Sequence, residues 1–316
     1  MARGRQDRPR SLKNAARSID SVPECTIRRL MAFAPGMGCD VPEPSSNALR
    51  AHDWETPLRR FPAERIVCLT EETVETLYLL GEEDRIVGVS GYAVRPPRVR
   101  KEKPRVSSFT SADVGRIAAL KPDLVLAFSD IQGPIIPDLA RAGLSVHLFN
   151  QRDLAGIFAM IRTLGALIGC PEKADALART LEARLDTVAA ETRHLATRPR
   201  VYFEEWDSPM ISGICWVSEL IEIAGGIDIF PELRARPEAK ERIVTPEQVV
   251  ERSPDVVLAS WCGKKVRLDS FKAREGWGRV PAVQSGRIVE IKSPLILQPG
   301  PAALTDGLDA IRAALR

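Results

Sequence analysis

One short phrase occurs twice in this chain, and this repeat constrains the fold more than any other feature. LKPDLVLAFSD occupies residues 120–130, and RSPDVVLASWC occupies residues 252–262. At the offset of 132 residues, the Pro-Asp pair and the Val-Leu-Ala run that follows it are identical in the two copies. ETLYLLG and ELIEIAG also correspond, at an offset of 144 residues. The repetition predicts two α/β lobes of related design.

Short β-branched runs alternate with helical spacing in both halves of the chain. The expected strands of the first half are 65–70, 85–90, 123–128 and 146–150, and its expected helices are 71–81, 111–122 and 135–144. The expected strands of the second half are 200–206, 255–260 and 287–292, and its expected helices are 216–226 and 245–254. Thr245 suits the N-cap of the last helix, and Pro246 suits its first position. This alternation on short loops predicts parallel sheets with helices on both faces.

The two halves are joined by a long stretch that reads as one helix. Its apolar residues form a single stripe, made of Ala174, Leu177, Leu181, Leu185 and Val188. Pro171 suits its start and Pro199 its end, and roughly 26 helical residues would span about 39 Å. One rigid helix between two lobes implies a cleft whose walls move little. We therefore expect a basic, Pro-rich and disordered N-terminal extension at 1–62, a first lobe at 63–152, connecting helices at 153–198 and a second lobe at 199–316.

Composition limits the possible partners. The 316 residues are 44% hydrophobic and 28% charged, as in ordinary globular chains. Of the net charge of +3, residues 1–30 contribute +5 (eight basic and three acidic residues), so the remainder carries −2. Such a body has no basic surface for nucleic acid, and we expect no nucleic-acid partner. No window reaches the roughly 18 apolar residues of a membrane span.

Targeting and metal signals are weak. The best candidate for a secretory signal is 26–39, but its apolar core is short and is interrupted by Pro35, so we interpret it as a linker. The six cysteines and three histidines show no zinc spacing. We therefore expect neither a metal site nor a cofactor.

Several segments resemble a known protein family. They are RIVCLTEETVETLYLLG, IVGVSGYAVRPP, RIAALKPDLVLAF, AGGIDIF and TPEQVVERSPDVV. Their order and spacing over about residues 65–316 resemble the class III (helical-backbone) periplasmic substrate-binding proteins of ABC importers, and most of all the cobalamin-binding branch. The resemblance implies a non-catalytic, monomeric receptor of the periplasm or envelope. It also implies cobalamin or another corrinoid as the ligand, held between the lobes, and an ABC permease dimer as the partner.

Candidate binding residues lie where the two copies of the repeat diverge, beyond the carboxyl ends of the strands. Ligands of open α/β sheets bind at these ends. The first lobe offers Tyr92, Phe109, Phe128 and Asp130, and the second offers Glu205, Trp206, Trp216, Trp261, Cys262, Lys264 and Gln298. Aromatic side chains give stiff contact area for the apolar face of a corrinoid, while a few polar groups orient its amide fringe. The resemblance places Tyr92, Phe109 and Phe128 where the cobalamin receptor has aromatic residues.

The candidate residues differ in how well they fit a role in ligand contact. We expect Trp206 and Trp261 to be the main contacts, whereas Phe128 and Trp216 also fit core positions. Lys264 would suit a carboxylate or phosphate on the ligand. Cys262 fits a small turn residue, and thiolate ligation of a metal is its alternative role.

Acidic residues on both lobes would dock to the permease if the resemblance holds. The docking position of the second lobe falls on Glu247. In the first lobe it falls on Gly115, which carries no charge, and Asp113 is the nearest acidic substitute. This difference weakens the expectation of an importer.

Other functions stay open at this point. An iron-siderophore or heme receptor of the same fold would use Arg95, Lys264 or Lys265, but the chain has only three tyrosines. A cytoplasmic corrinoid carrier, sensor or salvage protein is a further alternative. An enzyme would need a convergent catalytic set, and the only acidic cluster near the predicted pocket has Glu204 and Glu205 on opposite faces of one strand.

Overall fold

The computed structural model describes residues 61–316. The predicted N-terminal extension lies outside the described residues, apart from its last two positions. No helix within the described residues has the length and apolarity that a membrane crossing requires.

The first lobe contains one parallel sheet of five strands. These are β1 (Ile66–Cys68), β2 (Ile86–Ser90), β3 (Arg105–Ser107), β4 (Leu124–Phe128) and β5 (Val146–Phe149), in the order β3-β2-β1-β4-β5. Its helices are α1 (Glu71–Leu79), α2 (Val99–Glu102), α3 (Val114–Ala119), α4 (Ser129–Gln132) and α5 (Ile136–Arg141). All four predicted strands of this lobe are present, and β3 is an additional edge strand that the sequence pattern did not predict.

The second lobe has a related sheet with one antiparallel strand. Its strands are β6 (Arg200–Asp207), β7 (Met210–Ser212), β8 (Ile227–Asp228), β9 (Val256–Ala259) and β10 (Ile288–Glu290). The order is β10-β9-β6-β7, and β8 pairs with the start of β6. Only β7 runs antiparallel, in a hairpin with β6. Its helices are α8 (Cys215–Ile223), α9 (Pro246–Arg252), α10 (Leu268–Lys272), α11 (Pro281–Gln284), α12 (Ser293–Ile296) and α13 (Leu308–Leu315).

The repeated Pro-Asp pair has the same structural role in both lobes. The Asp123 carboxylate accepts hydrogen bonds from the backbone N–H groups of Glu64 and Arg65, at 2.9 Å each, just before β1. The Asp255 carboxylate accepts from the N–H of Arg200 at 2.8 Å, at the start of β6. Each aspartate thus ties the central strand of its sheet to the neighbouring strand, which explains why the chain contains the phrase twice.

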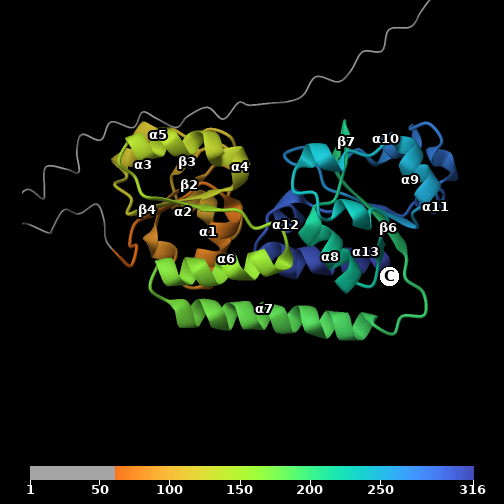
Figure 1. The fold of residues 1–316 in the computed structure, drawn as a ribbon, viewed down its shortest axis with the longest axis horizontal. Coiled ribbons are helices and arrows are strands. Elements are labelled where there is room, and N and C mark those ends of the chain that lie inside the picture. Colours follow the sequence, from red (N-terminus) through yellow and green to blue (C-terminus); the bar gives the residue numbers. More distant parts are fainter. Residues whose placement is uncertain (1–60) are drawn as a thin grey trace, which may run out of the picture. The chain divides into compact units, whose positions relative to one another are not determined.

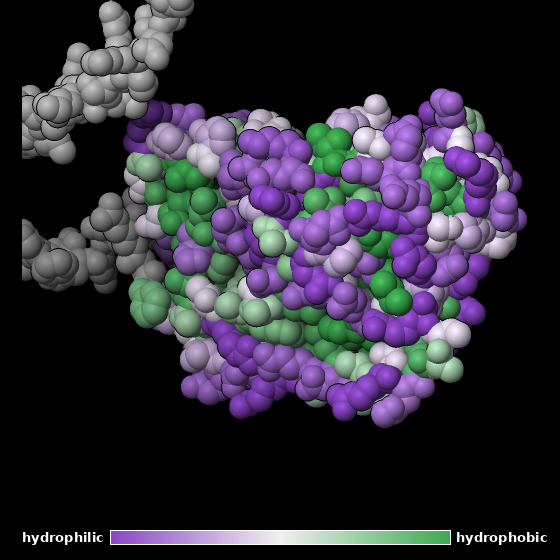
Figure 2. Space-filling model, turned by 45° about the vertical axis from the view of Figure 1, so that its right-hand side comes forward, coloured by the Kyte–Doolittle hydropathy of each residue, from purple (hydrophilic) through white to green (hydrophobic). Residues whose placement is uncertain are grey.

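Two antiparallel helices connect the lobes, α6 (Leu154–Leu167) and α7 (Pro171–Thr192) (Figure 1). The 22 residues of α7 are fewer than predicted. The helix ends early because the Thr192 hydroxyl donates to the carbonyl of Ile223 at 2.8 Å, which fixes this end against α8. The predicted apolar stripe is buried except for Leu177, which is half-buried. The outward face of α7, at the bottom of Figure 2, is hydrophilic.

Each lobe has a hydrophobic cluster of its own, and a third, larger core extends through both lobes. Its residues come from α1 of the first lobe, α8 and α13 of the second and both connecting helices. Because a close-packed core resists deformation, this arrangement favours small relative movements of the lobes.

Candidate ligand-binding site

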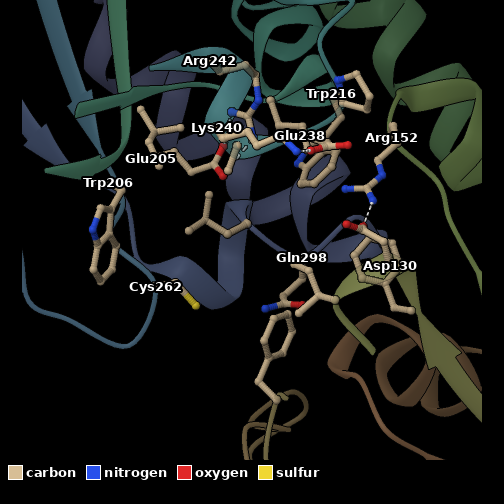
Figure 3. Close-up of a pocket in the computed structure, with 18 residues that line it drawn as sticks. Asp130, Arg152, Glu205, Trp206, Trp216, Glu238, Lys240, Arg242, Cys262 and Gln298 are labelled. Carbon is tan, nitrogen blue, oxygen red and sulfur yellow. Dashed lines mark hydrogen bonds and ion pairs between the residues drawn. The ribbon is translucent and has the colours of Figure 1, made fainter. Parts of the chain in front are cut away.

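A cavity of about 380 Å³ lies between the lobes, at the carboxyl ends of the strands (Figure 3). It is partly open to solvent. Its lining consists of Phe109, Phe128, Asp130, Ile131, Arg152, Glu205, Trp206, Ile211, Ile214, Trp216, Pro237, Glu238, Ala239, Lys240, Arg242, Cys262, Leu297 and Gln298. The cavity therefore lies at the position where ligands of open α/β sheets bind.

The first lobe contributes an aromatic ring and an ion pair. Phe128 is the last residue of β4, and Asp130 follows in the first turn of α4. Arg152 donates to the Asp130 carboxylate at 2.6 Å (Figure 3), and its guanidinium carbon lies 5.6 Å from the centre of the Phe128 ring. This hydrogen bond holds the pKa of Asp130 below its usual value. Asp130 is therefore an ionised, paired carboxylate at neutral pH.

The second lobe contributes a buried arginine. The Arg242 side chain is only 1% exposed, and it donates to both Glu205 oxygens, at 2.7 and 3.2 Å. It also donates to the carbonyl of Ser212 in β7. Arg242 belongs to the segment 231–243, of which residues 237–240 and Arg242 itself line the cavity (Figure 3). In the same segment Lys240 pairs with Glu238 at 2.5 Å.

Charges in the cavity wall are balanced one to one. The lining contains three cations, and each has a carboxylate partner that also lines the cavity: Arg152 with Asp130, Lys240 with Glu238, and Arg242 with Glu205. No cation of this lining remains to neutralise an anionic ligand without breaking a pair.

Apolar surface fills the rest of the wall. Trp216 is 3% exposed, and its indole N–H donates to the carbonyl of Ile296 at 2.9 Å. Trp206 is half-buried, and its N–H donates to the carbonyl of Ser208 at 3.0 Å. Both indoles therefore offer a ligand ring surface and no free donor.

Eight of the eleven predicted binding residues line this cavity. They are Phe109, Phe128, Asp130, Glu205, Trp206, Trp216, Cys262 and Gln298. Tyr92 is exposed beside the lining and packs edge-on against Phe109, with 6.5 Å between ring centres.

The other two predicted residues lie behind the wall. Trp261 is only 2% exposed and points into the second lobe, where its N–H donates to Glu204 at 3.2 Å. Lys264 lines a neighbouring groove and is hydrogen-bonded to Asp207. Glu204 is buried against Arg274 at 2.6 Å, so Glu204 and Glu205 do lie on opposite faces of β6.

The Cys262 thiol is poorly suited to metal ligation. Partial burial and the nearby carboxylates of Glu71 and Glu205 raise its pKa, so the thiol stays protonated at neutral pH. Among the described residues, no group of three or more His, Cys, Asp or Glu side chains is placed to hold a metal ion.

The docking candidates lie outside the cavity. Glu247 is exposed in the first turn of α9, which begins with the predicted Thr245 cap. Asp113 caps α3 by accepting from the N–H of Arg116 at 2.9 Å, and Gly115 is exposed on that helix. The acidic side chain nearest to Gly115 in sequence is therefore engaged in capping its own helix.

Two parts of the wall were not predicted from the sequence. Arg152 follows the last strand of the first lobe, and the segment 231–243 is a charged stretch with two short 3₁₀ turns, Pro231–Leu233 and Ala239–Arg242. The strand-end rule could have suggested Arg152. No sequence signal marked the segment 231–243, because its charges resemble those of any solvated loop.

Comparison with known proteins identifies the family. The sequence matches the family described as "Periplasmic binding protein" over residues 66–295. This chain belongs to the periplasmic binding protein family. The long helix α7 between two α/β lobes is the feature of its class III, helical-backbone members. Members of the family bind small molecules and work with ABC permeases.

Curated relatives within this family are named vitamin B12-binding proteins. The protein from Vibrio cholerae is 27% identical over 248 residues, which cover 77% of this chain and 86% of the relative. The protein from Yersinia pestis is 30% identical over 217 residues, covering 67% of this chain and 74% of the relative.

Solved structures with the same fold are named after different ligands. The periplasmic vitamin B12 binding protein of Vibrio cholerae superposes with a TM-score of 0.63 at 25% identity, over 80% of this chain and 97% of the other. The periplasmic heme-binding protein of Roseiflexus sp. RS-1 superposes with a TM-score of 0.69 at 25% identity, over 80% of this chain and all of the other. The fold alone therefore does not select the ligand.

Proposed function

We propose that this protein is a non-catalytic receptor that binds a corrinoid of the cobalamin type in the cavity between its lobes. The observation that carries the proposal is the charge balance of the wall. Its three cations are each paired with a carboxylate, and the remaining surface is mostly aromatic and aliphatic. A corrinoid suits this wall, because its ring is apolar on the face and carries neutral amides around the edge.

The cavity is smaller than a complete corrinoid. The ligand would therefore enter edge-on, with part of the ring in the open mouth. The aromatic side chains would contact its faces, and the paired polar groups would meet the amides.

Heme is the main alternative, because one similar structure is named a heme-binding protein. Heme iron in proteins is held by His, Met, Tyr or a Cys thiolate. Among the cavity-lining residues that the structure describes, none is His, Met or Tyr, and the thiol of Cys262 has a raised pKa. The cobalt of cobalamin carries its own axial groups and needs no protein ligand.

An anionic ferric siderophore is less favoured for a different reason. Such a chelate needs unpaired cations, and Arg152, Lys240 and Arg242 would each have to leave a carboxylate partner. Breaking these pairs would reduce the affinity for a negatively charged ligand.

The test uses the full chain and three ligands. The protein is mixed separately with cyanocobalamin, hemin and a ferric siderophore, passed through a desalting column, and its visible spectrum is recorded. We expect corrinoid absorbance to elute with the protein. Retention of hemin or siderophore alone would reject the corrinoid assignment, and retention of none would reject a receptor for any of these three ligands.

We further propose that delivery to an ABC permease depends mainly on the second lobe. Glu247 is exposed there, whereas the first lobe has Gly115 at the corresponding position and its Asp113 caps a helix. With a reconstituted cobalamin permease, Glu247→Ala should lower the stimulation of ATP hydrolysis and Gly115→Glu should raise it. Unchanged stimulation in both variants would argue against docking through these positions.

A further inference from the structure

The Trp206 indole lines the cavity and also has a cation close to its ring. Trp206 lines the cavity, whereas Lys264 does not and lines the neighbouring groove with Trp261. The Lys264 ammonium nitrogen lies 5.1 Å from the centre of the Trp206 ring. Figure 3 shows Trp206 on the same side of the cavity as Cys262, away from Asp130 and Arg152. Lys264 therefore contacts the Trp206 ring from outside the cavity lining.

The cation is held in place from two further directions. Both oxygens of Asp207 accept from its ammonium group, at 2.7 and 2.6 Å. The ring centre of Trp261 lies 4.9 Å from the same nitrogen. Trp261 itself is buried and hydrogen-bonded to Glu204. Lys264 thus links Trp206, at the edge of the cavity, to the buried Trp261 of the second lobe.

Among the described residues, Lys264 is the one cation that lies over the Trp206 ring, which otherwise packs against the hydrophobic core of the second lobe. Its indole N–H is bonded within its own turn, to the carbonyl of Ser208. An ammonium group over the ring is attracted by the negative face of the π system. This attraction limits rotation of the indole before a ligand arrives, and a preordered side chain loses less entropy on binding.

We propose that Lys264 is a positioning residue, which holds the Trp206 indole flat against the conjugated face of the bound ligand without touching the ligand itself. The inference rests on the proposed function and adds a residue to it. It replaces the expectation that Lys264 pairs with a carboxylate or phosphate of the ligand. It assigns recognition of the flat ring face to Trp206, and recognition of the edge groups to the paired polar residues.

The chain offers a matched control one residue away. Lys265 is exposed and lines the same groove. Within the described part of the chain, its ammonium group lies over neither indole. Lys264→Met removes the charge and leaves a side chain of similar length. Lys264→Arg keeps a cation at the same position. Lys265→Met removes the neighbouring charge instead. Both positions are on the surface, so all three variants should fold.

The experiment measures the dissociation constant for cyanocobalamin by equilibrium dialysis with the full chain. We expect Lys264→Met to weaken binding by about threefold to tenfold, the range for ordering one large side chain. Lys264→Arg should restore most of the affinity, and Lys265→Met should bind like the wild type. In a Trp206→Ala background, Lys264→Met should have no further effect, because its role acts through that indole.

The outcomes separate the two proposals. If the wild type binds cyanocobalamin and Lys264→Met binds equally well, the role of Lys264 is rejected and the receptor assignment stands. An equal loss in Lys265→Met, or a loss that persists in the Trp206→Ala background, would also reject a specific action through Trp206. If the wild type fails to bind cyanocobalamin, the ligand assignment and this inference are both rejected.

Discussion

The two copies of the repeated phrase are alike in the strand and differ at its end. Asp130 and Cys262 occupy equivalent positions, and both line the cavity. Ser129 and Trp261 are also equivalent, and both are buried on the other side of their strand end, at 0% and 2% exposure. The shared register therefore decides which side chain faces the cavity, while residue type decides only which chemical group that position offers. Trp261 is therefore buried in the core, because it stands one position before the residue that faces the cavity.

The corresponding helices α1 and α8 differ in the same way. Glu72 in α1 and Trp216 in α8 correspond at the offset of 144 residues, and both are buried. Trp216 lines the cavity, whereas Glu72 is buried in the first lobe at the boundary with the second. A β-carbon on Gly300 would lie 2.5 Å from the β-carbon of Glu72, so this contact requires glycine. One lobe thus places an acid where the other places an indole.

Trp261→Ala should give the largest effect and test the register argument directly. Removing a fully buried tryptophan should lower the free energy of unfolding by about 3–5 kcal/mol. Urea denaturation measures this, with Cys262→Ser as the control that should stay close to the wild type. Unchanged stability combined with lost ligand binding would place Trp261 in the site after all.

Glu72→Gln tests whether the buried acid of α1 makes the stability of the protein depend on pH. Burial raises the pKa of Glu72 to about 7, even though the Thr70 hydroxyl donates to it at 2.6 Å. A carboxyl whose pKa is raised by folding favours the folded state below its unfolded pKa, and this contribution is lost as the pH rises through the folded value. Between about pH 4.5 and pH 7, the wild type should therefore lose roughly 3 kcal/mol through this group.

The glutamine variant should lack this loss. Its free energy of unfolding should match that of the wild type near pH 5 and exceed it at pH 8, as measured by urea denaturation at both values. Trp216→Phe, at the equivalent position, keeps Glu72 and should therefore show the same loss as the wild type between pH 5 and pH 8. Parallel pH profiles for wild type and Glu72→Gln would contradict the argument.

Asp123→Ala and Asp255→Ala compare the two Pro-Asp pairs. Asp123 is buried and accepts two backbone hydrogen bonds, whereas Asp255 is half-buried and accepts one. We expect losses of about 2–3 and about 1 kcal/mol, respectively, in thermal or chemical unfolding. Asparagine at either position keeps an acceptor and should recover part of the loss. A larger effect at Asp255 would contradict the expected order. It would show that the stability of the second lobe depends more strongly on the hydrogen bond to its aspartate.

Asp130→Asn should have the smallest effect and tests the charge balance. It removes the carboxylate partner of Arg152, so the cavity wall gains a free cation. We expect affinity for the neutral corrinoid to change by less than about threefold, and affinity for hemin, which carries carboxylates, to rise by about threefold. Cys262→Ser, at the equivalent position of the second copy, should change neither. A large loss of corrinoid binding would show that Asp130 contacts the ligand directly.

The sequence alone determined the two lobes, the connecting helix and the edge of the sheets where the site lies. These features depend on local patterns: alternation of strands and helices, the cap at Thr245, and the repeated Pro-Asp pair. The start of α7 at Pro171 is also local, whereas its end at Thr192 depends on a contact with α8 and was placed too late.

Only the tertiary structure decided which strand-end residues meet in the cavity. The register of β9 turns Trp261 inward, the hairpin of β7 supplies the carbonyl that Arg242 contacts, and the segment 231–243 closes a wall without any sequence pattern. The pairing of charges also arises only there, because Arg152 is 22 residues from Asp130 and Arg242 is 37 residues from Glu205. Local sequence specifies backbone conformation through interactions between neighbouring residues. The cavity, in contrast, is formed by contacts between segments that are distant in the sequence, and only the packing of the folded chain brings these segments together.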